Sequence, residues 1–455
     1  MKIKLICCFA VFLHLQIARA QNAVTLTGKL INFGNQVTVT DLSDFQYLKM
    51  PAGERVIAPD VSGNFKISFD LAAPNYFRVG RNVLYLSPGD KLNVFIDNND
   101  NTRAIFKGSG QEANRYLATA PAPKSGSFLN AGLLIQYDIR ETLEAILLAA
   151  QQRSKQLAAL KSITPEFRRL EEARIKADII NSFKYVSSYA RVKQDLRYTP
   201  VLYGMMFNSV AKETKRKYQQ NFVDASLMKL PVYRDIAEEL VRVEPENPDA
   251  VKIKEWYKVS ALIDKMKREN DKSRLSAYAT QAEDFYDADY RAAARTYAQN
   301  LIKFGAGDAA VDFAAVDADG KKVYLSDLKG KIIYVNLWAT WCIPCLLEMP
   351  SLEQAKKKYA DNPNVAFVTL SIDDNADLLK WKKNLISRKA GGYQWQINRG
   401  KLNSYNVAEI PRSFLIDKDF KMVNMNAPMP SSKDLPLAIN NLLTIQSAPV
   451  FVKTK

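Results

Sequence analysis

Histidine is almost absent from this 455-residue sequence and cysteine is scarce, with one histidine and four cysteines in all. His14, Cys7 and Cys8 fall within the first twenty residues, which have the features of a removable leader. The rest of the chain then holds Cys342 and Cys345 and no histidine. This inventory excludes Cys–His and Ser–His nucleophilic catalysis and histidine-ligated metal centres. One close cysteine pair is not a disulfide framework either.

Residues 1–20 have the three parts of a secretory signal peptide. Two lysines precede an apolar run over residues 5–17, and a small-residue Ala-Arg-Ala motif offers a cleavage site before Gln21. The run is short for a membrane span, and no later segment reaches about 18 uninterrupted apolar residues. The sequence predicts an exported protein, periplasmic or associated with the cell envelope, with no integral membrane span after cleavage. An uncleaved anchor is the alternative.

The charge balance is strongly basic, with a formal net charge of +16, but the cations are not gathered in one dense block. Short clusters at residues 215–217 and 356–358 lie in segments with helical patterns, which is typical of a solvated helix face. We therefore expect a mild attraction to acidic surfaces and no nucleic-acid partner. The sequence offers no metal-ligand set and no cofactor motif, so neither a metal nor a cofactor is expected.

Three regions with different patterns predict a multidomain protein. From residue 21 to 110, short alternating runs separated by turn signals predict an N-terminal antiparallel β-sandwich. Residues 111–304 are rich in good helix formers with apolar residues three and four apart, which predicts a central α-helical segment. Residues 305–455 alternate between strand and helix patterns, which predicts a C-terminal mixed α/β fold. The expected strands of the first region are residues 24–30, 36–40, 64–70, 76–79, 83–86 and 91–96.

The chemistry is concentrated where an expected buried strand, residues 331–338, gives way to an expected helix, residues 346–359. Cys342 would lie at the helix N-terminus, where free N–H groups and the helix dipole stabilise a thiolate. Pro344 suits the first helical turn. Cys345 would lie one turn further, within reach of Cys342. We expect Cys342 to attack a target sulfur and Cys345 to resolve the mixed disulfide.

Three other interpretations of the pair remain open. A zinc half-site would need two further ligands that the mature chain does not supply as cysteine or histidine. A structural disulfide across three residues would close almost no loop and would stabilise little. Two unrelated buried cysteines are the third alternative.

Several motifs at fixed intervals resemble the TlpA/ResA-like thiol–disulfide oxidoreductases of the thioredoxin superfamily. The resemblance covers roughly 150 residues. It implies a thioredoxin-like fold for residues 305–455, and the end of the first region, at residues 108–114, resembles β-sandwich modules of Bacteroidetes-type exported proteins. The matching segments are residues 336–345 (NLWATWCIPC), 348–350, 319–321, 326–331, 371–373, 410–411 and 414–417.

The resemblance also implies roles for individual residues. Pro411 would be a cis-proline facing the cysteine pair, with the backbone of Ile410 pairing with substrate and Trp341 flanking the site. Glu348 would tune the thiol pKa values and relay a proton to or from Cys345. Asn336 stands where thioredoxins keep a buried aspartate, which gives more weight to Glu348 or water.

The resemblance implies reduction of protein disulfides in the periplasm, and an electron donor of the membrane DsbD/CcdA kind. The cysteine pair alone would also permit oxidation. One alternative is a thiol peroxidase on the same fold. Another is a scaffold or binding protein in which the redox domain is auxiliary, since roughly 280 mature residues precede that domain.

Overall fold

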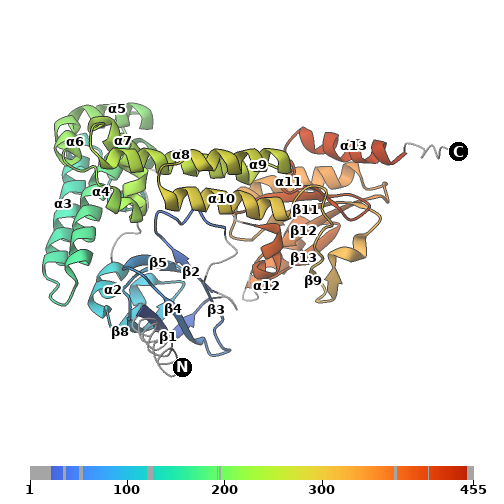
Figure 1. The fold of residues 1–455 in the computed structure, drawn as a ribbon, viewed down its shortest axis with the longest axis horizontal. Helices are drawn as coiled ribbons and strands as arrows, with labels where there is room; N and C mark the ends of the chain where they lie inside the picture. Colours follow the sequence, from blue (N-terminus) through green and yellow to red (C-terminus); the bar gives the residue numbers. More distant parts are fainter. Residues whose placement is uncertain are drawn as a thin grey trace, which may run out of the picture. The chain divides into compact units, whose positions relative to one another are not determined.

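The computed structural model describes residues 22–33, 37–50, 55–119, 127–191, 193, 196–373, 377–407 and 409–447. The expected signal peptide, residues 1–20, lies outside them. The described residues form two compact units (Figure 1). One comprises residues 22–47 and 55–258, and the other comprises residues 48–50 and 259–447. The three-way division expected from the sequence stays a prediction.

The first unit begins with two four-stranded sheets that share one hydrophobic core, so the expected sandwich is present. Alternate residues of the strands point inward, as Val24 and Leu26 do in β1. The pairing of β1 with β7 is parallel, whereas a wholly antiparallel arrangement was expected. The sheets run β4-β1-β7-β8 and β3-β2-β5-β6. Their strands are β1 (Ala23–Ile31), β2 (Val37–Asp41), β3 (Arg55–Ile57), β4 (Asn64–Asp70), β5 (Asn75–Val79), β6 (Asn82–Leu86), β7 (Lys91–Asp97) and β8 (Ile105–Gly108).

Helices make up the rest of the first unit, and several begin where the sequence places a cap followed by proline. The Thr164 hydroxyl accepts the Phe167 N–H, and the Thr199 hydroxyl accepts the Leu202 N–H, each just before a proline in the first helical turn. The helices are α2 (Gln111–Ala118), α3 (Ile139–Ala158), α4 (Pro165–Ala190), α5 (Pro200–Val210), α6 (Lys212–Gln219), α7 (Pro231–Val243) and α8 (Asp249–Arg268), the last of which continues into the second unit.

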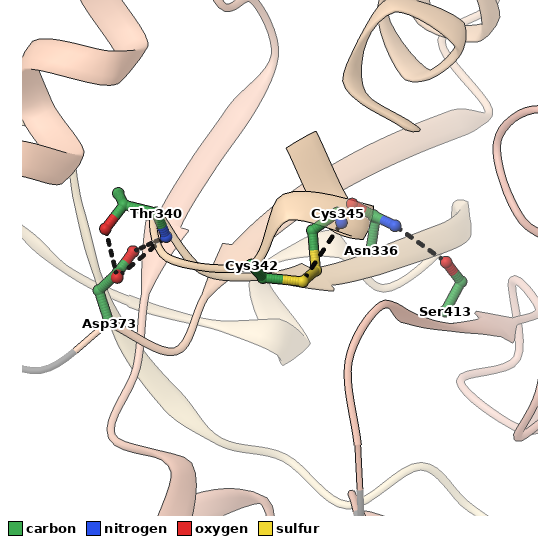
Figure 2. Close-up of a disulfide and its surroundings, with 6 residues drawn as sticks. All are labelled: Asn336, Thr340, Cys342, Cys345, Asp373 and Ser413. Atoms are coloured by element: carbon green, nitrogen blue, oxygen red, sulfur yellow. Dashed lines mark hydrogen bonds between the residues drawn. A yellow bond between two sulfur atoms is a disulfide. The ribbon is translucent and has the colours of Figure 1, made fainter. Parts of the chain in front are cut away.

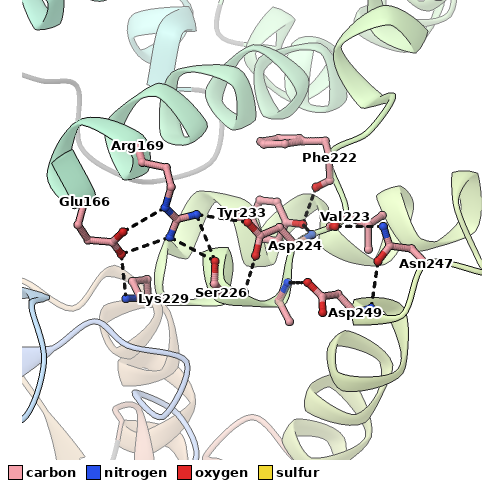
Figure 3. Close-up of polar contacts among 11 residues, drawn as sticks. Glu166, Arg169, Phe222, Val223, Asp224, Ser226, Lys229, Tyr233, Asn247 and Asp249 are labelled. Carbon is pink, nitrogen blue, oxygen red and sulfur yellow. Dashed lines mark hydrogen bonds and ion pairs between the residues drawn. The ribbon is translucent and has the colours of Figure 1, made fainter.

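Two polar networks hold α4 in place. In Figure 3, Arg169 of α4 forms ion pairs with Glu166 at 3.1 Å and with Asp224 at 3.3 Å, which connects α4 to the turn before α7. Deeper in the unit, Arg174 pairs with Glu171, and the Tyr76 hydroxyl of β5 donates to Glu171 at 2.7 Å. These side chains are buried, and partners satisfy the charges, as a buried ion pair requires. Their role is therefore structural.

The second unit contains a seven-stranded sheet in the order β10-β9-β13-β12-β11-β14-β15. The central strands β11, β12 and β13 are parallel, so the helices α11 and α12 that follow β11 and β12 start at the same sheet edge. The strands are β9 (Ala314–Asp317), β10 (Lys322–Tyr324), β11 (Ile332–Trp338), β12 (Val365–Ser371), β13 (Tyr393–Gln396), β14 (Arg412–Ile416) and β15 (Met422–Asn424). The helices are α9 (Lys272–Gln281), α10 (Ala288–Lys303), α11 (Ile343–Lys358), α12 (Leu378–Arg388) and α13 (Asp434–Ser447).

The expected fold class is correct: strand-rich sheets, a helical segment and a C-terminal thioredoxin-like domain follow one another along the chain. The sequence missed β13, which lies in the middle of the large sheet. Within the described part of the chain, no helix is long and apolar enough to cross a membrane. The same residues contain no cluster of three metal-ligating side chains.

Candidate functional site

Cys342 and Cys345 lie at the junction of β11 and α11. All seven residues of β11 are buried, so this strand fixes the junction in the domain core. Cys342 is the N-cap residue of α11, Pro344 is in the first turn, and Cys345 is one turn along. The two sulfurs form a disulfide, with a Cα–Cα distance of 5.2 Å (Figure 2).

The surroundings of the Cys342 sulfur favour its anionic form. The Cys345 N–H donates to Cys342 Sγ at 3.2 Å, and the N-terminus of α11 directs its dipole toward this sulfur. An N–H donor and a helix N-terminus are both features that stabilise a thiolate over a neutral thiol. Cys342 is 5% exposed and Cys345 is 1% exposed, so both residues are buried. The role of Cys342 as the attacking thiol stays a prediction, and its N-cap position supports it.

On one side of the cysteine pair, Asp373 holds the turn that leads into it. The Thr340 N–H donates to both carboxylate oxygens at 3.0 Å, and the Thr340 hydroxyl donates to Oδ1 at 2.8 Å. The Ser371 hydroxyl donates to Oδ2 at 2.7 Å. Asp373 is fully buried, so neutral donors satisfy this carboxylate in place of water. Figure 2 shows it on the opposite side of the disulfide from Asn336.

On the other side of the cysteine pair, Asn336, the residue expected at the place of the buried acid of thioredoxins, belongs to a network of three neutral side chains. Asn336 Nδ2 donates to Ser413 Oγ at 3.1 Å, and the Tyr334 hydroxyl bonds to the same oxygen at 2.8 Å. All three residues are buried. Burial raises the pKa of Tyr334 well above its usual range, and the negative charge of Glu348 adds to the effect. This network therefore has no group that ionises near neutral pH.

Glu348 lies two turns into α11 and is partly exposed. Its carboxylate accepts the Ser431 N–H at 2.9 Å and the Ser431 hydroxyl at 2.8 Å. Its hydrogen bonds to described residues thus go to Ser431 and not to either cysteine. The expected role in proton transfer stays a prediction, and Ser431 is the competing partner.

The expected substrate-binding residues frame the same edge of the sheet. Trp341 is 56% exposed beside the disulfide. The Ile410–Pro411 peptide bond is cis, as the resemblance implies. Pro411 directly precedes β14, whose Arg412 lies opposite Leu337 near the end of β11. The contact of this backbone with a substrate stays a prediction.

The guanidinium of Arg412 forms hydrogen bonds to backbone carbonyls of this chain, so we do not expect it to bind substrate. Its Nε and Nη2 donate to the Met425 carbonyl at 3.1 and 2.9 Å, and its Nη1 donates to the Asn406 carbonyl at 3.0 Å. Burial lowers the pKa of this guanidinium. Arg412 therefore anchors the segment on either side of Pro411.

Sequence reasoning missed Asp373, Ser413 and Ser431 as members of the site. A signal for Asp373 was available, because it follows a buried strand parallel to the one that leads to the cysteines, and such strand ends meet at one edge. Ser413 and Ser431 had no comparable local signal.

Comparison with known proteins places this domain in a family. Residues 306–425 match the model of the AhpC/TSA family. Thiol-disulfide oxidoreductase ResA of Bacillus thuringiensis is 37% identical over 123 residues, which cover 27% of this chain and 69% of the relative. Thioredoxin-like protein YneN of Bacillus subtilis is 31% identical over 125 residues, which cover 27% of this chain and 72% of the relative.

A solved structure, the thioredoxin domain of a thiol-disulfide oxidoreductase from Bacteroides vulgatus, aligns at 25% identity. The alignment covers 30% of this chain and 97% of the other, with a TM-score of 0.28. On the similarity to ResA, the chain belongs to the ResA-like thiol–disulfide oxidoreductases, with the matching residues in its C-terminal thioredoxin-like domain.

Proposed function

We propose that this protein is an exported oxidoreductase that reduces protein disulfides by dithiol exchange through Cys342 and Cys345. One observation carries the proposal: the attacking sulfur caps a helix, and the second sulfur lies within bonding distance one turn away. A structural disulfide of this span would stabilise little. A zinc site would need two further ligands beside the cysteine pair.

The proposed reaction begins with the reduced pair. The Cys342 thiolate attacks one sulfur of a client disulfide, the client S–S bond breaks, and its second sulfur leaves as a thiolate that takes up a proton. Cys345 then loses its proton and attacks Cys342 Sγ, which releases the first client sulfur as a thiol. Two electrons pass to the client, and the enzyme is left with the Cys342–Cys345 disulfide.

Glu348 is proposed to accept the proton from Cys345 in the second step, after exchanging its hydrogen bonds with Ser431. The exposed Trp341 and the backbone of Ile410, before Pro411, are proposed to hold the client segment. A membrane dithiol donor of the DsbD/CcdA kind is proposed to return the enzyme to its reduced form.

The proposal extends to the organisation of the whole chain. Residues 1–20 would direct export to the periplasm or cell envelope. A sandwich domain over 21–110 and a helical domain over 111–304 would precede the redox domain over 305–455. In this arrangement the helical segment is an accessory to the redox domain, in contrast to the scaffold alternative.

Trapping of mixed disulfides tests the function directly. Cys345→Ser leaves the attacking thiol but removes the resolving one, so periplasmic clients should accumulate as mixed disulfides that a reductant releases. Cys342→Ser is the matched control and should trap none. If Cys345→Ser traps no protein and the wild-type protein does not reduce insulin, the proposal fails. That result would favour the scaffold alternative. Consumption of peroxide at rates above those of disulfide reduction would favour the peroxidase alternative.

A further inference from the structure

The helix α5 has apolar residues on both its buried and its exposed side. On the buried side, the Phe207 ring lies 5.5 Å from the Phe183 ring of α4, and a side chain at Gly204 would overlap Ser187 of the same helix. A helix turns by about 100° per residue, so the residues that do not face α4 fall on the opposite half. The exposed apolar ones are Val201 (58%), Leu202 (43%), Met205 (65%) and Val210 (43%), and these four residues are the α5 face. Ser209 is the exposed polar residue among them.

An apolar outer side is unusual for a helix at the surface of a protein. The outer side normally carries charged and polar residues, and a helix that is apolar all round normally has partners on every side. Pro200–Val210 contains no charged residue at all. Figure 1 shows α5 at the outer edge of the helices of the first unit. We therefore expect an external partner to cover the α5 face.

Helix α6 extends the same outer layer. It follows α5 directly, since Ala211 ends the first helix and precedes the second. The carbonyl of Gln220, at the end of α6, accepts a hydrogen bond from Lys176 of α4 at 3.2 Å. Lys176, Phe183 and Ser187 are seven and four residues apart, so they lie on one stripe of α4. Helices α5 and α6 therefore lie on the same side of α4, and their exposed sides face away from it.

Cations lie on the exposed side of this layer, at both ends of α5. Residues 191–217 contain seven basic and two acidic residues, which gives a net charge of +5. Lys215 lies on the inner side of α6 and pairs with Glu239 of α7 at 2.6 Å. The exposed cations are Arg191, Lys193 and Arg197 before α5 and Lys212, Arg216 and Lys217 on α6. The sequence alone predicts a solvated helix face for residues 215–217, and the structure adds an apolar face next to it.

We propose that the α5 face and the cations at its two ends bind the surface of an anionic lipid leaflet. The apolar side chains would enter the boundary between headgroups and acyl chains, and the cations would contact lipid phosphates. Lysine and arginine side chains can keep their apolar stems on the α5 face while their charged ends reach the headgroups. The inference concerns attachment to a membrane surface, and it is independent of dithiol exchange by Cys342 and Cys345.

An anionic lipid surface fits these features better than a second copy of the chain. A symmetric dimer would use the same patch on both sides of its interface. The cations of one copy would then face the cations of the other, and like charges in contact disfavour association. Lipid phosphates supply the opposite charge. Charge complementarity therefore selects lipid, and dimerisation is one outcome of the test.

The test measures binding of the mature chain, residues 21–455, to lipid vesicles by sedimentation. The expected leader is left out because its apolar run, residues 5–17, would itself enter lipid. At low ionic strength, vesicles of phosphatidylcholine with about 30% phosphatidylglycerol should bind the protein at least about tenfold more strongly than phosphatidylcholine alone. Salt at about 0.5 M should remove most of that difference.

Two double variants test the two parts of the surface. Leu202→Gln combined with Met205→Gln removes apolar area and should weaken binding to the anionic vesicles about tenfold. Arg216→Gln combined with Lys217→Gln removes two cations and should weaken it by about tenfold or more. Thermal unfolding of each variant checks that it is folded. Met205→Trp adds a gain of signal, because its fluorescence should be quenched by bromine-labelled lipid chains more than that of the wild type.

Matched controls make the same changes in the second unit. Leu379 and Ile386 of α12 are 75% and 77% exposed and have lysines beside them. Leu379→Gln combined with Ile386→Gln should leave vesicle binding within about twofold of the wild type. Lys418→Gln combined with Lys421→Gln changes two exposed cations of the turn between β14 and β15 and should also leave it unchanged.

The outcomes decide between lipid and the other interpretations. Equal binding to both kinds of vesicle, or wild-type binding by both α5 and α6 variants, would show the inference to be wrong. Loss of binding in the α12 control would assign lipid contact to α12 and would overturn the inference as well. A concentration-dependent dimer that Leu202→Gln and Met205→Gln abolish, without vesicle binding, would make the α5 face an interface between copies. Cys342→Ser should bind vesicles as the wild type does, so failure here leaves the proposed function intact.

Discussion

Replacement of Asp373 by alanine should destabilise the C-terminal unit strongly, because this buried carboxylate satisfies three donors. Those donors are the Thr340 N–H, the Thr340 hydroxyl and the Ser371 hydroxyl, at 2.7 to 3.0 Å. A buried donor left without its acceptor costs about 1–3 kcal/mol. Removal of a buried charge recovers some desolvation energy. We therefore expect a net loss of about 3 kcal/mol in the free energy of unfolding, and a fall in Tm of roughly 10 °C.

Two further variants test the size of this loss in the free energy of unfolding. Asp373→Asn keeps an oxygen for Thr340 and offers an N–H to the Ser371 hydroxyl, so it should cost roughly 1 kcal/mol. Asp317→Ala is the matched control, because Asp317 also accepts backbone N–H groups, from Asp319 and Lys321, but in an exposed turn. Its cost should stay under about 1 kcal/mol.

The free energy of unfolding is measured by urea unfolding, monitored by circular dichroism. The reactivity of the cysteine pair is measured by its rate of alkylation. A double-mutant cycle between Asp373→Asn and Thr340→Val should give a coupling energy of about 1 kcal/mol. In reduced protein, alkylation of Cys342 by iodoacetamide should slow in Asp373→Ala, since the turn is no longer held. A stability of Asp373→Ala within about 0.5 kcal/mol of wild type, or a coupling energy of zero, would refute the reasoning.

Three further predictions concern other parts of the molecule. Glu348→Gln should lower the rate of disulfide reduction and shift its pH profile, whereas Ser431→Ala, which frees the same carboxylate, should not lower it; stopped-flow Trp fluorescence across pH reads both. Arg412→Lys cannot reproduce the forked hydrogen bonds to the Met425 carbonyl and should cost about 2 kcal/mol in urea unfolding. Glu112 accepts two backbone N–H groups from the loop after α3, which lower its pKa from 4.5; its stabilisation is present above that value and is lost as the pH falls through the lowered pKa. Glu112→Gln should therefore flatten the acid side of the stability curve measured by urea midpoints.

Local patterns predicted much of the fold, and the exceptions have a common cause. The strand at residues 64–70 has the bounds expected from its alternation, and β1 differs from expectation by one residue at each end. In contrast, β13 is four residues, Tyr-Gln-Trp-Gln, with no clear period, and it is a strand because β12 and β9 pair with it. The parallel pairing of β1 with β7 is likewise a long-range choice. Short segments whose conformation depends on distant partners cannot be predicted from their own sequence.

The distinction between local patterns and long-range contacts also applies to the site. Cys342 and Cys345 were evident because their chemistry and their helix start are local, whereas Asn336 and Ser413 meet across 77 residues. That contact joins two side chains that carry no charge. The raised pKa of the Tyr334 hydroxyl keeps the third member of the network neutral as well. This network therefore contributes no pH dependence of exchange near neutrality. The Glu348→Gln profile is for this reason the measurement that separates a proton relay from a site in which the thiols exchange protons with water.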